Sequence, residues 1–414
     1  MRLWLKLSLL VCLSGPVAAA GTQLQPLLDA AEPGSVLLLQ PGQYAGPGII
    51  EKTLTLKGQE GVSIIGNGEG SVLTVSAPNV HVHALHITGS GDSHETKDAG
   101  ITLTKKAKGA RVTNTVLQGN LYGIDVHGAQ NARVEGNVIE GRQDHRMNRR
   151  GNGIYLWNAA GTEVVGNDVR WGRDGIFVNT SKRNLFKNNR FRDLRFAVHY
   201  MYANDSEVSG NISIGNHLGF AIMYSRNVRV IGNASIGDRE HGVMLNFANR
   251  SEVRDNYVKD GATKCLFVYN AHKNTITNNR FERCGIGVHF TAGSERNKLT
   301  GNAFIGNRTQ VKYVSTKWLD WAEDGVGNYW SDFAATDLNA DGIADGTYRP
   351  NDSIDQVLWS QPAARLLLGS PAVQLVQWAQ SEFPALTAGG VMDTRPLMSP
   401  ITLEPPRWGE QHEG

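Results

Sequence analysis

The sequence predicts an all-β protein folded as a right-handed parallel β-helix, with a helical cap at its N-terminus and a helical, irregular extension at its C-terminus. Three observations predict this fold class. A phrase built on asparagine recurs every 22–23 residues through the middle of the chain. The apolar runs between these asparagines are short and alternating, which is typical of strands. The chain also contains 47 glycines among 414 residues, which indicates frequent turns.

The repeated phrase is an apolar residue, any residue, then Gly, Asn or Asp, then Asn. Its copies are separated once by 30 residues, three times by 22 and three times by 23, and the long interval contains a polar run at 142–150. Each period is expected to form one coil of three short strands, stacked on the next coil at about 4.8 Å. The asparagine then occupies the same corner of every coil, where it tolerates the left-handed backbone conformation. Its amide is expected to donate to the next one in a buried ladder: Asn137, Asn167, Asn189, Asn211, Asn233, Asn256, Asn279 and Asn302.

The N-terminal 20 residues are expected to be a cleavable signal peptide. Arg2 and Lys6 form a positive start, Leu7 to Leu13 an apolar core, and Ala18 to Ala20 a small-residue cleavage site. Removal of this segment lowers Lys plus Arg from 41 to 39, equal to the 39 acids. A nearly neutral exported chain argues against a nucleic-acid partner.

The solenoid is expected over residues 21–311, followed by a C-terminal extension over 312–414. Residues 22–32 have helical spacing and are expected to cap the open end of the first coil. The helical pattern at 362–383 is expected to form a second cap on the last coil and to dock a membrane partner. The docking residues of this segment are Leu366, Leu367 and Trp378.

An acidic loop in the extension resembles the first half of a calcium loop, since acidic residues alternate and end in glycine. The possible ligands of Ca²⁺ or Mg²⁺ are Asp337, Asn339, Asp341 and Asp345. No glutamate follows at the twelfth position, so a plain polar turn is the alternative.

The ladder also predicts which side chains face outward. Residues thirteen and eleven positions before each ladder asparagine are mostly apolar and should face the core, so those at twelve and ten should face out. The outward pairs are Asp125/His127, Tyr155/Trp157, Phe177/Asn179, His199/Met201, Ala221/Met223, Met244/Asn246 and Phe267/Tyr269. Thioether and imidazole groups suit Cu(I), and the candidate ligands are His199, Met201, Met223, Met244, His241 and His289. The alternative is a face that packs under a loop or a partner.

Two further features carry open alternatives. The segment 142–153 is expected to protrude as a loop whose Arg146, Arg149 and Arg150 dock an acidic partner, or to be a plain solvated loop. Cys265 and Cys284 could form a disulfide, remain buried thiols or bind a soft metal.

An enzymatic alternative follows from the fold class, because many right-handed β-helices act on acidic polysaccharides. A lyase, epimerase or sugar hydrolase would need a base, a second proton-transfer group and a charge neutraliser. The candidates are Asp125 and His127 with Arg142 or Lys182. No carboxylate pair recurs along the outward face, which disfavours this class.

Several segments together resemble the NosD family of exported β-helix proteins. They are HYMYANDSEVSGN, GFAIMYSRN, DREHGVMLN, the GNYWSD block with the acidic loop after it, and the ending RPLMSP. The resemblance covers essentially the whole mature chain.

This resemblance implies a protein of the periplasm that is peripheral to the inner membrane and that handles copper without being a catalyst. The implied partners are an ABC transporter, made of a permease and an ATPase, a copper chaperone lipoprotein, and apo nitrous oxide reductase. Contact with the membrane would run only through the permease. The resemblance does not by itself assign the histidines and methionines of the outward face.

Overall fold

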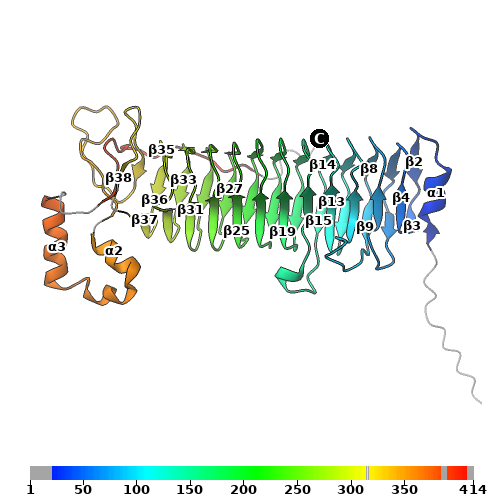
Figure 1. Cartoon of the computed structure of the whole chain (residues 1–414), viewed down its shortest axis with the longest axis horizontal. Coiled ribbons are helices and arrows are strands. Elements are labelled where there is room, and N and C mark those ends of the chain that lie inside the picture. Colours follow the sequence, from blue (N-terminus) through cyan, green and yellow to red (C-terminus); the bar gives the residue numbers. More distant parts are fainter. Residues whose placement is uncertain (1–20, 314, 316, 352, 384–388, 408–414) are drawn as a thin grey trace, which may run out of the picture.

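A computed structural model describes residues 21–313, 315, 317–351, 353–383 and 389–407. The signal peptide expected over residues 1–20 lies outside this range. The chain forms one long right-handed parallel solenoid, with the N-terminal helix at one end and the C-terminal extension at the other (Figure 1). None of the helices in the described part of the chain has the length and apolar character needed to cross a bilayer.

Three long parallel sheets form the walls of the solenoid. The first, sheet 1, contains β1 (Thr22–Gln23), β3 (Gly42–Ala45), β6 (Val62–Ile65), β9 (His86–Thr88), β12 (Val116–Gln118), β15 (Val138–Glu140), β18 (Asp168–Arg170), β21 (Arg190–Arg192), β24 (Ile212–Ile214), β27 (Ala234–Ile236), β30 (Tyr257–Lys259), β33 (Arg280–Glu282), β36 (Ala303–Ile305) and β39 (Tyr329–Trp330).

Sheet 2 contains β4 (Gly48–Ile50), β7 (Leu73–Val75), β10 (Ala99–Leu103), β13 (Tyr122–His127), β16 (Ile154–Trp157), β19 (Asp174–Asn179), β22 (Phe196–Met201), β25 (Leu218–Met223), β28 (His241–Asn246), β31 (Lys264–Tyr269), β34 (Ile286–Phe290) and β37 (Thr309–Tyr313). Sheet 3 contains β2 (Val36–Leu39), β5 (Thr55–Gly58), β8 (His81–His83), β11 (Arg111–Thr113), β14 (Arg133–Glu135), β17 (Glu163–Val165), β20 (Leu185–Lys187), β23 (Glu207–Ser209), β26 (Arg229–Ile231), β29 (Glu252–Arg254), β32 (Thr275–Thr277) and β35 (Lys298–Thr300).

The predicted asparagine ladder is confirmed at the corner between sheets 3 and 1. The side-chain amide nitrogen of each ladder asparagine donates to the side-chain oxygen of the next ladder asparagine at 2.9–3.0 Å, from Asn137 through Asn302. Asn302 donates to Asn328 in the same way, and Asn328 donates to Asp393, so the ladder is one coil longer than expected. The ladder asparagines are 0–1% exposed, which makes their hydrogen bonds obligatory for the fold.

One detail of the ladder prediction is wrong. The left-handed conformation belongs to the residue before each ladder asparagine, for example Gly136, Asn188 and Asp255, with φ of 63°, 54° and 57°. The ladder asparagine itself turns its amide inward. The repeated phrase therefore has Gly, Asn or Asp before the ladder asparagine because these residues tolerate the left-handed backbone conformation at that position.

The N-terminal cap is confirmed as α1 (Leu24–Ala30). Leu24 and Leu28 are buried and belong to the continuous core of the solenoid, which prevents the first coil from exposing its apolar end. The solenoid continues slightly beyond residue 311, because β39 still pairs with β36.

The expectation that the helical pattern at 362–383 caps the last coil is wrong. The last coil is covered by Trp321, Trp330 and Tyr348, which are 2–7% exposed, and by a small sheet of β38 (Trp318–Asp320) and β40 (Gly390–Met392). Trp330 stacks on Phe304 at 4.4 Å between ring centroids. Aromatic rings close this end because they cover the open coil with few side chains.

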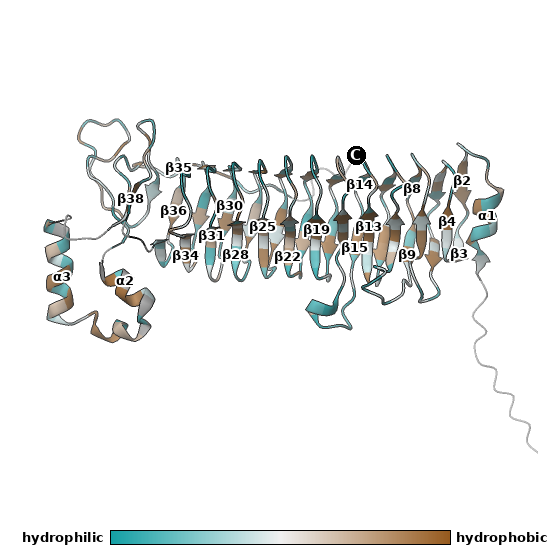
Figure 2. Ribbon diagram, in the orientation of Figure 1, coloured by the Kyte–Doolittle hydropathy of each residue, from teal (hydrophilic) through white to brown (hydrophobic). Residues whose placement is uncertain are grey.

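The segment at 362–383 instead forms η2 (Pro362–Leu367) and α3 (Pro371–Glu382) and projects beyond this end, together with the preceding helix α2 (Ser353–Ser360), which the sequence pattern does not predict (Figure 1). We call these three elements the arm. Hydrophobic residues recur along it (Figure 2). Leu366, Leu367 and Trp378 are 91%, 58% and 58% exposed. The residues predicted to dock a partner are thus available on the surface.

Cys265 and Cys284 form a disulfide between neighbouring coils. This pairing decides among the disulfide, the buried thiols and the soft-metal site that the sequence left open. Cys265 and Cys284 are 19 residues apart, have Cα atoms separated by 5.6 Å and are buried. Neither is available as a metal ligand.

Candidate metal centre

Sheet 2 presents the outward face in the predicted register. One column of paired residues, here called column 1, runs along it: Asp125, Tyr155, Phe177, His199, Ala221, Met244, Phe267 and His289. Column 2 lies two residues further along each strand and contains His127, Trp157, Asn179, Met201, Met223, Asn246 and Tyr269. The residues between the two columns, such as Tyr200, Ile222 and Leu245, are 0% exposed and fill the core.

Four of the six candidate ligands surround one alanine. In column 1, Ala221 of β25 pairs with His199 of β22 on one side and with Met244 of β28 on the other. In column 2, Met223 pairs with Met201 and follows Ala221 by two residues. Ala221 faces outward yet is 0% exposed, so neighbouring side chains close over its methyl group. We call His199, Met201, Met223 and Met244 the Ala221 cluster.

The imidazole of His199 is held by a buried carboxylate. Its Nδ1 lies 3.1 Å from Oδ2 of Asp174, which also accepts two hydrogen bonds from Arg195 at 2.8 and 2.7 Å. Burial raises the pKa of Asp174, but the hydrogen bonds from His199 and Arg195 outweigh it and leave that pKa below its ordinary value. An ionised Asp174 favours a proton on Nδ1, and this leaves Nε2 as the ring nitrogen available to a metal ion.

Aromatic rings complete the position of His199. Phe196 stacks on the imidazole at 4.5 Å and Phe177 meets it edge-on at 4.8 Å. The His199 side chain is only 11% exposed. A fixed, poorly hydrated imidazole beside thioethers is a donor set typical of Cu(I) rather than of hard cations.

His241 and His289 form a second group further along the solenoid. Both rings lie against Phe267, at 5.1 and 4.9 Å between centroids, and Phe267 stands between Met244 and His289 in column 1. Burial, together with the charge of Lys264, lowers the pKa of each histidine to about 4. Nδ1 of His289 is buried and lacks a hydrogen-bond partner.

The six candidate ligands therefore do not form a single site. His199 and His289 are four coils apart, which corresponds to about 19 Å. Lys264 and Lys312 also lie close enough to lower the pKa of His289, and such cations oppose the binding of a positive ion. Of the two groups, the Ala221 cluster has the donor atoms better suited to Cu(I).

The acidic loop has few free oxygen atoms in this structure. Asp337 accepts hydrogen bonds from the backbone amides of Asp341 and Gly342, and Asp345 accepts one from Leu338. Among the described residues, no group of three or more His, Cys, Asp or Glu side chains is arranged to hold a metal ion. This geometry agrees with the polar turn, and the expectation of Ca²⁺ or Mg²⁺ gains no support.

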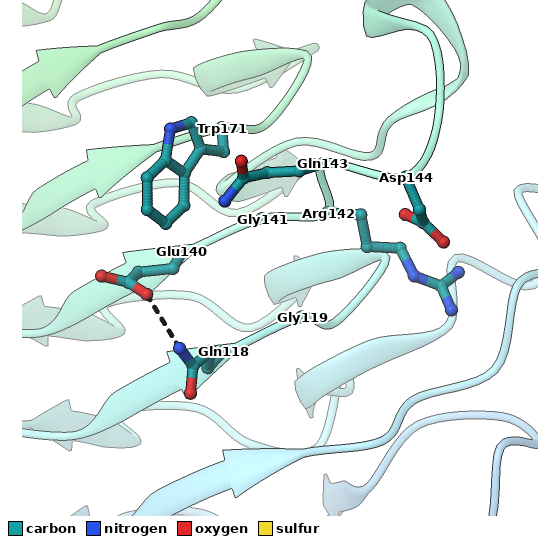
Figure 3. Close-up of a pocket in the computed structure, with 8 residues that line it drawn as sticks. All are labelled: Gln118, Gly119, Glu140, Gly141, Arg142, Gln143, Asp144 and Trp171. Atoms are coloured by element: carbon teal, nitrogen blue, oxygen red, sulfur yellow. Dashed lines mark hydrogen bonds between the residues drawn. The ribbon is translucent and has the colours of Figure 1, made fainter.

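The loop at 142–153 protrudes from sheet 1, as predicted (Figure 1). Arg146 and Arg149 are exposed, whereas Arg150 folds back and donates to the carbonyl oxygen atoms of His145 and Gln143 at 2.8 and 3.2 Å. Beside the loop lies a polar hollow of about 380 Å³, in which Gln118 donates to Glu140 at 3.1 Å next to Trp171 (Figure 3). This hollow is lined by residues outside the two columns.

The four residues proposed for the enzymatic alternative, Asp125, His127, Arg142 and Lys182, do not form one site. Asp125 and His127 share the outward face with a closest approach of 4.0 Å, and burial raises the pKa of Asp125 to about 7. Arg142 lines the hollow near sheet 1 and pairs with Asp92. Lys182 is exposed at the corner after β19. An acid with a pKa near neutrality is present, but Arg142 is committed elsewhere.

Comparison with known proteins assigns the chain to a family. A family described as periplasmic copper-binding protein (NosD) matches residues 136–335, and the right-handed beta helix region matches residues 58–169. A Stutzerimonas stutzeri protein called probable ABC transporter binding protein NosD is 38% identical over 405 residues, covering 94% of this chain and 93% of that protein. The protein of the same name from Pseudomonas aeruginosa is 39% identical and covers 89% of each.

This chain belongs to the NosD family.

Solved structures similar to this NosD chain share its fold alone. A mannuronic acid specific polysaccharide family 6 lyase has a TM-score of 0.51, 13% identity and coverage of 86% and 95% of the two chains. The family 28 exopolygalacturonase of Yersinia enterocolitica has a TM-score of 0.50 and 13% identity, covering 70% and 73%. Identities this low carry no information about chemistry.

Sequence reasoning missed two residues that organise this NosD site. Asp174 pairs through sheet 2 with Phe196, three residues before His199, and so lies outside the two columns that the ladder spacing defines. The ladder spacing places Ala221 on the outward face but does not indicate that it is the small position between His199 and Met244. The sequence does carry a signal for this role, because Ala221 is the one small residue in a column otherwise made of large side chains.

Proposed function

We propose that this NosD protein binds Cu(I) at the Ala221 cluster and relays it during the maturation of nitrous oxide reductase. The observation that carries the proposal is the strand register, which places three thioether side chains and one oriented imidazole on the outward face beside a single covered alanine. Soft sulfur ligands and neutral imidazole favour Cu(I) over Mg²⁺ or Ca²⁺. The description of the family as copper-binding supports the same metal.

The Asp174–His199 pair supports a role in transfer as well as in binding. A carboxylate that fixes the second ring nitrogen of a histidine orients the ligand and raises its basicity. Thioethers bind Cu(I) without carrying a charge, so the cluster would hold the ion without neutralising it. Such a site suits cargo that must leave again.

We place the protein in the periplasm, after removal of residues 1–20, and peripheral to the inner membrane. The names of the two relatives support an ABC transporter, with its permease and ATPase, as one partner. The copper chaperone lipoprotein would deliver copper, and apo nitrous oxide reductase would receive it. The arm, through Leu366, Leu367 and Trp378, would contact the permease, and Arg146, Arg149 and Arg150 would contact an acidic partner.

An anaerobic titration of the mature protein with Cu(I) and a competing chelator tests the proposal. The parent should bind Cu(I), whereas a His199→Ala/Met201→Ala variant should lose at least tenfold in affinity. A matched control is His127→Ala/Asn179→Ala, which removes residues of column 2 outside the cluster. Unchanged affinity in the first variant would remove the Ala221 cluster as the copper site.

A second candidate function rests on Asp125. An outward carboxyl group with a pKa of about 7 beside His127 is a group that could act in general acid–base catalysis of a polysaccharide lyase or epimerase. Assay of the parent on polyuronates, with Asp125→Asn as the inactive variant, tests it. Absence of turnover by the parent would dismiss this function.

A further inference from the structure

An unusual row of aromatic side chains borders the Ala221 cluster. Tyr202, Tyr224 and Phe247 lie at the corner between sheets 2 and 3, on the three coils that carry Met201, Met223 and Met244. They are 53%, 40% and 39% exposed. Neighbouring rings lie 5.2 Å apart between centroids with interplanar angles of 21° and 7°. We call these three residues the aromatic corner.

The backbone at this corner is one that aromatic residues rarely adopt. Tyr202, Tyr224 and Phe247 have φ of 52°, 48° and 50° in the left-handed region. Other coils place Gly128, Asn158 and Asn270 at the equivalent position, with φ of 77°, 50° and 43°. Glycine and asparagine tolerate this conformation, so the fold itself does not require rings here. At this left-handed position the rings occupy the coils of the proposed copper cluster, and on the next coil Tyr269, one residue before Asn270, meets Phe247 edge-on at 5.8 Å.

The charge around the aromatic corner is strongly one-sided. The exposed charged residues of the adjoining turns are Lys182, Arg183, Asp205, Arg226, Arg250 and Lys273. Within the described residues, the five cations among them form no ion pair. Arg229, by contrast, lies on the neighbouring sheet 3 and pairs with Glu207 at 2.8 Å. An unpaired cluster of cations produces a field that attracts an acidic surface.

We infer that the aromatic corner and its basic border are the docking surface for an acidic face of the folded protein that exchanges copper with this chain. The inference rests on the proposed function. The stacked rings cover one another's faces and present their edges and the two tyrosine hydroxyl groups, and tyrosine is enriched at protein interfaces. A partner seated there would bring its own metal ligands directly beside Met201 and Met223.

The occupant is a protein whose charge is complementary to the border. Charged rims accelerate encounter and lose this effect at high salt, whereas the aromatic edges supply contact area at the centre. The basic border would thus attract the partner electrostatically, and the aromatic corner would hold it next to the thioethers of Met201 and Met223. An anionic lipid surface or an acidic polysaccharide would also meet cations, and both serve as alternative outcomes of the test.

The experiment measures association of the mature protein with the soluble domain of the copper chaperone lipoprotein and with apo nitrous oxide reductase of the same organism. The variants are Arg226→Glu/Arg250→Glu and Tyr224→Ser. The control is Lys105→Glu/Lys106→Glu, which reverses two exposed cations nearer the N-terminus. Biolayer interferometry at low and high salt gives Kd, and a separate titration gives Cu(I) affinity.

We expect the double arginine reversal to weaken association with at least one of the two proteins tenfold or more at low salt. Tyr224→Ser should weaken it several-fold at both salt concentrations, and the control should change it less than twofold. Equal loss in the control would overturn the inference, as would no association of the parent with either protein. Corner-dependent binding to anionic vesicles or to a polyuronate, without an effect on protein association, would also overturn it.

Copper affinity distinguishes this inference from the proposed function. If the corner variants weaken protein association while Cu(I) binding by the His199→Ala/Met201→Ala variant equals that of the parent, the docking surface stands and the proposed copper site falls. If that variant loses copper and the corner variants bind both proteins normally, the docking surface falls.

Discussion

At the scale of single residues, the small side chain of Ala221 has a specific consequence for copper. Ala221→Leu would add three carbon atoms where the four cluster side chains have to converge, without removing a ligand. Column 1 accepts bulky residues elsewhere, as Phe177 and Phe267 demonstrate, so the fold should tolerate the change. We expect Cu(I) affinity to fall at least tenfold with a nearly unchanged thermal midpoint. Asn179→Leu is the matched control, and equal copper binding by both variants would contradict the assignment.

A second residue, Asp238, predicts how stability depends on pH. It is fully buried, and although Ser213, Ser235 and the amide of Asn216 donate to it at 2.7, 2.5 and 2.8 Å, burial raises its pKa from 3.8 to about 6. The folded state therefore holds this proton more tightly than the unfolded state. The contribution of Asp238 is most favourable below pH 3.8 and is lost as pH rises through 6, a cost on the order of 3 kcal/mol above that pH.

Asp238→Asn tests this pH dependence, because asparagine keeps the size and removes the charge. The variant should unfold at a higher temperature than the parent at pH 7.5, and this advantage should shrink at pH 5. His241 and His289 also titrate differently on unfolding, but both proteins carry them and their contribution cancels in the difference. An advantage of the same size at both pH values would exclude the buried charge as its cause.

At the scale of elements, the asparagine ladder stabilises each coil against the next. The side-chain oxygen of Asn211 accepts hydrogen bonds from the backbone and the side chain of Asn189. Its side-chain nitrogen donates to the backbone oxygen of Phe186 and to the side-chain oxygen of Asn233. Asn211→Ala leaves several buried partners unsatisfied, at about 1–3 kcal/mol for each. Calorimetry should record a fall of several degrees in the thermal midpoint. Asn148→Ala, at an exposed position of the protruding loop, is the control, and an equal effect would mean that the ladder adds little.

The arm makes a separate prediction, because Leu366 and Leu367 are 91% and 58% exposed. Leu366→Ser/Leu367→Ser should leave the thermal midpoint and Cu(I) affinity unchanged and should weaken co-purification with the permease several-fold. Leu338→Ser, at a residue 89% exposed in the acidic loop, provides a control on an equally accessible leucine. A loss of thermal stability in the arm variant would instead mean that these leucines pack on the solenoid.

At the scale of the whole molecule, the period of 22–23 residues is sufficient to predict the solenoid and its outward columns. A period of this kind fixes which residues stack, because each coil repeats the same three strands. It could not predict that Asp174 reaches His199, since that contact joins positions outside the two columns. The same register does place Phe267 between Met244 and His289, but it does not indicate that both His241 and His289 lie against this ring.

The C-terminal end was harder to predict for a different reason. The repeat ends there, so no register relates Trp321, Trp330 and Tyr348 to the coil that they cover. The helical pattern at 362–383 predicts η2 and α3 but not α2, and an apolar helix side fits a cap and a docking surface equally well. Only the position of Asp393, 65 residues after Asn328 and yet closing its ladder, reveals how the end is sealed.

The assignment of copper to the Ala221 cluster is tested most directly by X-ray absorption at the copper edge on the Cu(I)-loaded mature protein. Three thioethers and one imidazole predict a first shell dominated by sulfur with one nitrogen. In Met201→Ile/Met223→Ile, the sulfur contribution should fall to a third or be lost together with the copper. A first shell of nitrogen and oxygen alone in the parent, or an identical spectrum in this variant, would contradict copper binding at the Ala221 cluster.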